Sequence, residues 1–309
     1  MLVNAQSLGA IDTGFRTIFF SNLSDPKTLE LVRGAVQVVS STSKQEQYNW
    51  LYRLGNVREW IGPRVLNRFK AYGYTVENKK WEDSVELDRD DITDDKLGQY
   101  VPQIQTMAGE MNNHYLRLVT ALLEGGFAVT CYDGQFFFDT DHPVGDGASA
   151  GVASNTDTMV LSATALKLAF ENLPTLIDDR GDPLGIVYDT LIVHPSKRFV
   201  VKKLLEAELF IKRAGTSVDY NEVQGLIPNV IYDPYISDSN KWFLIDSSKA
   251  LKPIVLQIRE SPQWAGVTDP DDSFVFQTDK FLFGTKARHN AGYLLWQLAY
   301  GSTGTVAEP

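Results

Sequence analysis

The sequence contains little of what covalent cross-links, membrane anchors and secretion require. Cys131 is its single cysteine, so no disulfide can form within the chain, and we expect folding in a reducing cytoplasm. No run of about 18 apolar residues occurs, which excludes a helix long enough to span a membrane and predicts that no membrane is a partner. The first residues lack a basic start followed by an apolar core, so we expect no secretory signal.

Catalytic signatures are also scarce. The histidines 114, 142, 194 and 289 form neither HExxH nor a close pair, and the GxSxG, GxGxxG and GxxxxGK(S/T) patterns are missing. A Cys131 nucleophile paired with His142 or His194 has no local support, because Cys131 follows the apolar Phe127–Val129. We therefore expect a protein that is not an enzyme and that holds no cofactor and no metal.

Positive charge is in short supply, since the formal net charge is −10 and the isoelectric point is near 4.9. A protein that grips DNA phosphates usually presents a basic face, so this balance excludes tight nucleic-acid binding as the main activity. It remains compatible with a wall that encloses DNA without holding it.

The charges that are present are segregated in an aromatic-rich block, residues 44–95. Bases dominate first and acids afterwards: the bases are Arg53, Arg58, Arg64, Arg68, Lys70, Lys79 and Lys80, and the acids are Glu82, Asp83, Glu86, Asp88, Asp90, Asp91, Asp94 and Asp95. Two interpretations stay open. The block is either a hairpin with two solvated faces, or a projecting loop whose basic part docks on the acidic part of a neighbouring copy.

Apolar periodicity predicts the main elements of the first half. We expect an N-terminal arm over residues 1–40 with a short helix after Asp25-Pro26, then a strand at 36–39 and another at 72–77. The longest helix is predicted at 96–125, with its start near Thr93 and its end at Gly125-Gly126. Its apolar stripe consists of Ile104, Met107, Met111, Leu118, Val119 and Leu122.

The second half reads as an α/β module followed by apolar strands. We expect helices at 162–172 and 197–212, and strands at 190–193, 229–232, 242–245 and 253–259. Phe274 and Phe276 occupy alternate positions, as do Phe281 and Phe283, which predicts strand. A closing strand is predicted at 293–300, and the polar tail from Ser302 is expected to be disordered.

The segment Tyr132–Val144, YDGQFFFDTDHPV, carries the densest set of chemical groups. Asp139, Asp141 and His142 could hold a divalent cation through oxygen and nitrogen ligands. The competing interpretation is a turn in which Asp139 and Asp141 cap backbone amides, and the three phenylalanines favour this structural role.

Four segments in the same order resemble one protein family. They are Trp50–Asp95 followed by KLGQYVP, the YDGQFFFDTDHPV segment, WFLIDSSKALKPIVLQIRESP at 242–262, and FLFGTKARHNAGYLLWQLA at 281–299. Together they resemble the major head subunit of Mu-like phages, the gpT family. The middle of the chain is harder to match.

The resemblance implies an α+β fold of the Hong Kong 97 type with two domains. Residues 1–43 would be an N-terminal arm and 44–95 an extended β-hairpin loop. Residues 96–126 and 266–309 would form a peripheral domain with a long spine helix and a β-sheet. Residues 127–265 would form an axial α/β domain.

The implied function is self-assembly into hexamers and pentamers of an icosahedral phage head that encloses double-stranded DNA. The implied location is the virion, assembled in the host cytoplasm, with scaffold, portal and decoration proteins as further partners and with DNA enclosed non-specifically. The candidates for contacts between subunits are Trp60, Arg64, Arg68, Phe69, Lys70, Tyr72, Tyr74, Asp88, Asp90 and Asp91. Two alternatives remain, an encapsulin-like compartment shell and a metal-dependent hydrolase that uses Asp139, Asp141 and His142.

Overall fold

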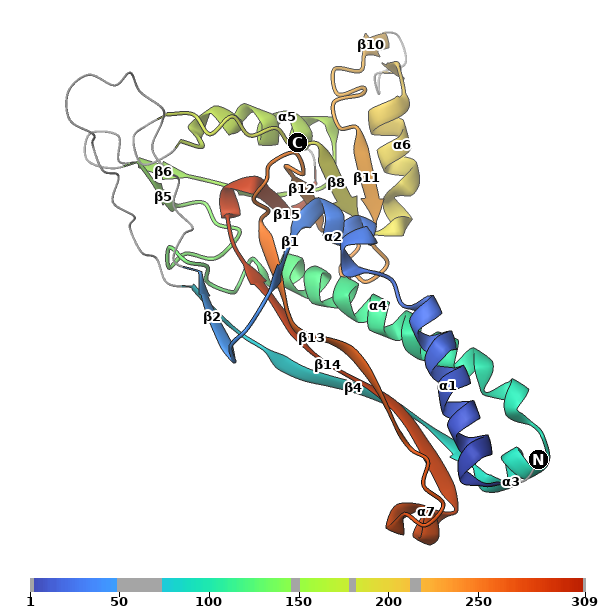
Figure 1. Ribbon diagram of the computed structural model, residues 1–309. Helices are drawn as coiled ribbons and strands as arrows, with labels where there is room; N and C mark the ends of the chain where they lie inside the picture. Colours follow the sequence, from blue (N-terminus) through green and yellow to red (C-terminus); the bar gives the residue numbers. More distant parts are fainter. Residues whose placement is uncertain (1–2, 49–73, 146–150, 178–181, 212–217, 308–309) are drawn as a thin grey trace.

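A computed structural model describes residues 3–48, 74–145, 151–177, 182–211 and 218–307. The described residues form a long narrow sheet with helices along it and a second, shorter sheet at one end (Figure 1). No helix in these ranges is long and apolar enough to cross a membrane.

The N-terminal region is more ordered than an arm with one short helix. Helix α1 (Ala5–Asn22) begins with a capping box between Asn4 and Ser7, in which each side chain accepts from the other's backbone N–H. Its buried face consists of Leu8, Ile11, Phe15 and Phe19 at three- and four-residue spacing. This face packs against the long helix and the sheet, and Trp264 Nε1 on the sheet donates to Asp12 Oδ1 at 2.8 Å. The sequence indicated only the short helix after Asp25-Pro26, so helix α1 is an addition to that prediction.

The expected short helix follows as a 3-10 turn, Pro26–Thr28, capped by the Asp25 side chain, and then α2 (Glu30–Ala35). The long helix is α4 (Val101–Gly125), with Pro102 in its first turn and Gly126 just after its end. Its start lies later than predicted, because α3 (Arg89–Thr93) and a 3-10 turn at Leu97–Gln99 occupy the preceding residues. The predicted end is confirmed.

The long sheet has the strand order β1-β13-β14-β4, with β1 parallel to β13 and the other neighbours antiparallel. Helix α4 contacts β14 and β4, so the sheet and the long helix share a core. The strands are β1 (Val36–Ser40), β13 (Ile254–Val267), β14 (Lys280–Tyr293) and β4 (Lys79–Asp88).

Helix α7 (Ser273–Thr278) lies at the far end of the β13–β14 hairpin (Figure 1). The prediction of strand for Phe274 and Phe276 was wrong. Asp272 caps the helix by accepting from the Phe274 N–H at 2.8 Å, and Val275 supplies the buried contact. Phe276 is 88% exposed, so its alternation with Phe274 reflects neither a strand nor a buried face.

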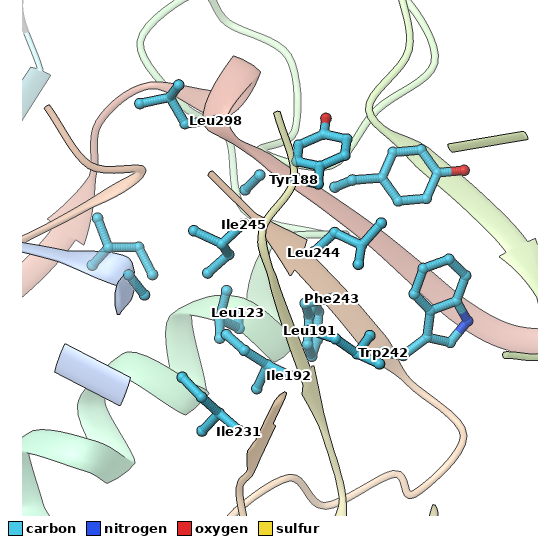
Figure 2. Close-up of a cluster of buried hydrophobic side chains, with 14 of the residues drawn as sticks. Leu123, Tyr188, Leu191, Ile192, Ile231, Trp242, Phe243, Leu244, Ile245 and Leu298 are labelled. Atoms are coloured by element: carbon cyan, nitrogen blue, oxygen red, sulfur yellow. The ribbon is translucent and has the colours of Figure 1, made fainter. Parts of the chain in front are cut away.

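The second sheet has the order β11-β8-β12-β15-β7. Every residue of β8 and β12 is buried, which explains why these strands read as continuous apolar runs (Figure 2). The strands are β11 (Asn229–Tyr232), β8 (Thr190–Val193), β12 (Trp242–Ile245), β15 (Ala299–Val306) and β7 (Thr156–Met159).

Helices α5 (Ala163–Glu171) and α6 (Arg198–Glu206) share a hydrophobic core with this sheet. Helix α6 ends earlier than predicted, because the chain turns into β9 (Leu209–Ile211), which pairs with β10 (Val218–Tyr220). The tail was predicted to be disordered, but β15 runs through it to Val306 between β12 and β7.

The two sheets interleave along the chain. Strand β13 lies in the long sheet, whereas β15 lies in the shorter one, and a 3-10 turn at Trp296–Leu298 connects β14 to β15. The predicted domain boundaries at 95, 126 and 265 stay predictions. Two short antiparallel strand pairs complete the described fold: β2 (Gln45–Tyr48) with β3 (Tyr74–Glu77), and β5 (His142–Val144) with β6 (Gly151–Ala153).

Candidate functional site

The acidic run forms the outer edge of the long sheet and the turn that follows it. Strand β4 pairs with β14 on one side only, so its other edge is open within the described chain. Glu82, Glu86 and Asp90 are exposed along this stretch. Glu86 forms an ion pair with Lys280 at 2.6 Å, which leaves Glu82 and Asp90 as the more available carboxylates.

Two of the predicted contact carboxylates, Asp88 and Asp91, form hydrogen bonds within the chain. Asp88 caps α3 by accepting from the Asp90 N–H at 2.9 Å. Asp91 accepts from the Tyr100 hydroxyl and from Gln99 Nε2, and forms an ion pair with Lys96. These bonds fix the turn that leads into α4.

An open groove of about 320 Å³ lies between β4 and the first turns of α4. Its lining combines an acid with apolar and small polar side chains: Asp83, Val85, Pro102, Gln103, Thr106 and Met107. A groove of this kind can accept an aromatic or aliphatic side chain beside a cation.

Six of the ten predicted contact residues belong to the range 49–73, between β2 and β3 in the sequence. Trp60, Arg64, Arg68, Phe69, Lys70 and Tyr72 lie outside the described residues. Tyr74 is half-buried in β3 and packs in a small core with Tyr48, Val76, Val255 and Leu294. Burial raises the pKa of the Tyr74 hydroxyl, as expected for a ring that faces its own chain.

Of the two interpretations of this segment, the structure supports the favoured turn at Asp139 and not the cation site at Asp139, Asp141 and His142. Asp139 caps a turn, because its carboxylate accepts from the Phe136 N–H at 3.1 Å and from the Thr140 N–H at 2.7 Å. Asp141 takes part through its backbone carbonyl, which accepts from Gln135 Nε2. Within the described ranges, His142 shares a group of ligand atoms with Cys131 and Asp133 and not with Asp139 and Asp141. The hydrolase alternative requires Asp139, Asp141 and His142 as joint ligands, and this arrangement does not bring them together.

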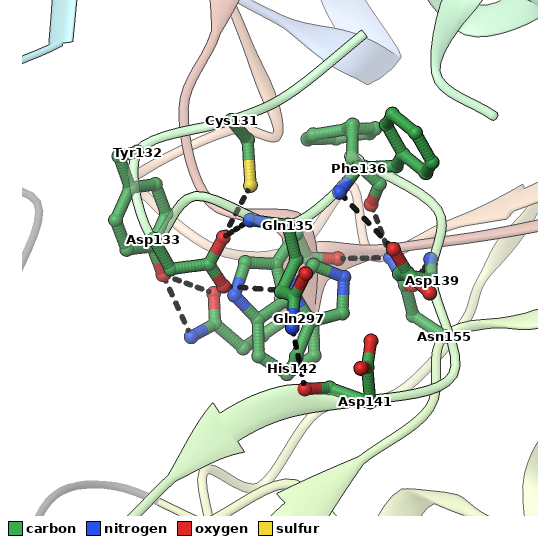
Figure 3. Close-up of polar contacts among 12 residues, drawn as sticks. Cys131, Tyr132, Asp133, Gln135, Phe136, Asp139, Asp141, His142, Asn155 and Gln297 are labelled. Atoms are coloured by element: carbon green, nitrogen blue, oxygen red, sulfur yellow. Dashed lines mark hydrogen bonds and ion pairs between the residues drawn. The ribbon is translucent and has the colours of Figure 1, made fainter. Parts of the chain in front are cut away.

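The true partner of His142 is Asp133. His142 Nδ1 lies 2.7 Å from Asp133 Oδ2, and Cys131 Sγ donates to Asp133 Oδ1 at 3.0 Å (Figure 3). Burial and the bond to Asp133 raise the pKa of the Cys131 thiol far above its ordinary value, so it is not a reactive nucleophile. Burial alone would raise the pKa of Asp133, but the bonds from His142 and Cys131 hold it below its ordinary value.

A second polar cluster lies between α4 and the long sheet. The ring centroids of His114 on α4 and His289 on β14 are 5.1 Å apart, and Trp81 and Tyr115 flank them. Neither ring nitrogen of His289 has a hydrogen-bond partner within the described chain, and His114 Nε2 and the Tyr115 hydroxyl also lack one. Burial, with His114 adding to it, lowers the pKa of His289 to about 3, and burial with Arg117 lowers that of His114. Sequence spacing gave no sign of this pair.

Comparison with known proteins identifies the fold and the family. The profile of the Mu-like prophage major head subunit gpT matches residues 8–160 and 229–308, which is most of the chain and leaves out the middle of the α/β module. The chain belongs to this gpT family.

Individual gpT relatives agree. The chain is 32% identical over 270 residues to the Mu-like prophage FluMu major head subunit of Haemophilus influenzae, covering 87% of this chain. It is 29% identical over 308 residues to the major capsid protein of Escherichia phage Mu, covering 99% of this chain and 76% of that protein. The chain spans 65% of the length of the Haemophilus protein.

Solved structures give the same fold. A chain of the bacteriophage JBD30 procapsid superposes with a TM-score of 0.62 at 28% identity, covering 97% of this chain and 76% of that one. A chain of the JBD30 capsid superposes with a TM-score of 0.53 at 22% identity, covering 90% of this chain and 65% of that one. The chain therefore has the Hong Kong 97-type fold, as the resemblance implied.

Proposed function

We propose that this gpT-family chain is the shell-forming subunit of a phage head. Copies of it associate into hexamers and pentamers, which close an icosahedral shell around double-stranded DNA, and the protein resides in the virion without an enzymatic role. The observation that carries this proposal is the family match over both ends of the chain together with the procapsid fold.

Shell contacts are heterologous, because a patch on one copy meets a different patch on the next. We place one such contact between the basic loop of one copy and the acidic edge of another. The loop side comprises Trp60, Arg64, Arg68, Phe69, Lys70 and Tyr72, with Tyr74 at its base. The exposed Glu82 and Asp90 supply the opposite charge, and the β4–α4 groove supplies an apolar seat for an aromatic side chain. Asp88 and Asp91 contribute indirectly by fixing the turn that presents Asp90.

Charge reversal tests this contact. The double variant Arg64→Glu with Arg68→Glu is expected to reduce shell formation and to weaken its dependence on salt, because exposed ion pairs are screened. A matched charge-swap variant adds Glu82→Lys and Asp90→Lys to the same chain and is expected to restore part of the assembly. If the double variant assembles as the unaltered chain does at every salt concentration, the docking contact is wrong.

Self-association itself is tested by electron microscopy of the purified chain in negative stain, with size-exclusion elution beside it. We expect shells, tubes or five- and six-membered rings, formed by the chain alone or after co-expression with a scaffold protein. A chain that stays a monomer or dimer under both conditions would overturn the proposal. Particle contents then separate a DNA-filled head from an encapsulin-like compartment that holds proteins.

Further partners belong to the same proposal. One solved JBD30 capsid is described as decorated with minor capsid protein trimers, and we extend a decoration partner to this chain together with scaffold and portal proteins. Packaged DNA is enclosed without specific binding. A net charge of −10 supports this, because an acidic wall does not hold phosphates tightly.

A further inference from the structure

Three different metal-ligating groups converge at the start of the YDGQFFFDTDHPV segment. The Cys131 sulfur, a carboxylate oxygen of Asp133 and a ring nitrogen of His142 all lie within 4.8 Å of one another. Figure 3 shows the three side chains pointing toward one another from the turn and from β5. The side chains of Asp133 and His142 are 5% and 0% exposed, and Cys131 is 7% exposed.

The backbone holds these groups in place before any ligand is present. Cys131 N–H donates to the Gln135 carbonyl at 2.8 Å, and Gly134 has φ +91°, which closes a tight turn around Asp133. The His142 ring stacks on Trp296, with centroids 3.8 Å apart and an interplanar angle of 9°. The site is therefore preorganised from two sides, by the turn and by the connection between the two sheets.

The existing hydrogen bonds join the three groups through one carboxylate. Asp133 accepts from the Cys131 thiol at one oxygen and contacts His142 Nδ1 at the other. A divalent cation bound by all three groups would take the place of these two contacts, and the thiol would release its proton to solvent, because metals bind the thiolate.

We propose that Cys131, Asp133 and His142 bind one thiophilic divalent cation of the zinc class. Zinc accepts sulfur, imidazole and carboxylate ligands together, and three protein ligands leave a fourth position for water. The ion would tie the 131–135 turn to β5 and, through the stacked Trp296, to the β14–β15 connection.

Cobalt(II) is the probe, because its thiolate complexes have a charge-transfer band in the near ultraviolet. The chain without an affinity tag is unfolded with chelator and reductant, refolded in cobalt chloride and freed of excess ion. Cys131 is the only cysteine, so a thiolate-to-cobalt band in the unaltered chain can arise from this site alone. We expect that band and about one cobalt per chain, both replaced by zinc and both lost in denaturant.

Two variants refine the test. Cys131→Ser is expected to lose the charge-transfer band, and its far-ultraviolet circular dichroism reports whether it still folds. Asp141→Asn is the matched control, because Asp141 lies on the same segment but outside the cluster, and it is expected to keep the band. If the refolded unaltered chain shows no thiolate band and retains no metal after dialysis, the cluster is a hydrogen-bonded network only and the proposal fails.

Discussion

Acid should loosen the contact between α4 and the long sheet through His289. Its pKa is about 3 in the folded chain and 6.5 as the ordinary value, which we take for the unfolded chain. Between pH 6.5 and about pH 3, His289 is protonated in the unfolded chain but neutral in the folded chain. Protonation therefore favours the unfolded state, and the free energy of unfolding falls as the pH drops from 6.5 to about 3. At pH 5 the loss from this residue is about 2 kcal/mol, from 1.5 units at about 1.4 kcal/mol each.

The variant His289→Phe isolates this effect. A phenylalanine keeps an aromatic ring beside Trp81 and Tyr115 and has no titrating group, so the free energy of unfolding should fall about 2 kcal/mol less between pH 7.5 and pH 5 than in the unaltered chain. Urea unfolding of the unassembled chain, followed by tryptophan fluorescence, measures it. The range stops at pH 5, so that the carboxylates Glu46, Glu77 and Glu260, whose pKa values are lowered, stay ionised.

The matched control is Thr285→Val. Thr285 is also buried on β14 and its hydroxyl also lacks a partner within the described chain, but it does not titrate. Its pH dependence should equal that of the unaltered chain. If the free energy of unfolding falls equally in the unaltered chain and in His289→Phe between pH 7.5 and pH 5, the reasoning is refuted. Protonation of the buried imidazole would then not cause the loss of stability.

Three further substitutions test the packing. Gly304→Ala should destabilise the fold by roughly 2 kcal/mol or more, because φ is +61° and a Cβ would overlap the Asn240 backbone; thermal unfolding measures it. Trp264→Phe removes the bond to Asp12 and should lower stability by about 1–2 kcal/mol, with faster amide exchange in α1 as the readout. Phe276→Ser should change monomer stability by less than about 0.5 kcal/mol in the same melts, and a larger loss would show that α7 packs more than its exposure indicates.

Local sequence signals predicted some elements well because one physical cause dominated each. Helix α4 follows from an uninterrupted apolar stripe between Pro102 and Gly126, and β12 follows from four apolar residues that are buried on both faces. Helix α1 was missed although its signal was present, since Asn4 and Ser7 form a capping box ahead of the Leu8 stripe.

Other features depend on contacts that spacing does not encode. Phe274 and Phe276 alternate like strand residues, but Asp272 caps a helix there at the end of a hairpin. Asp133 was passed over as a partner of His142, because Asp139 and Asp141 are closer in sequence. Only the turn at Gly134 and the stacking on Trp296 bring His142 to Asp133. The His114–His289 pair joins residues from opposite ends of the chain and needs the tertiary fold.

Because β15 is formed by residues 299–306, the five-stranded sheet can be completed only late in synthesis of the chain. This strand, which ends at Val306, lies between β12 and β7, so the five-stranded sheet is incomplete until the ribosome has released the residues that form it. A nascent or prematurely terminated chain that stops before Ala299 leaves the edges of β12 and β7 unpaired. Such a chain exposes strand edges that invite aggregation. A chain truncated before Ala299 therefore lacks β15 and cannot present the complete five-stranded sheet to neighbouring copies.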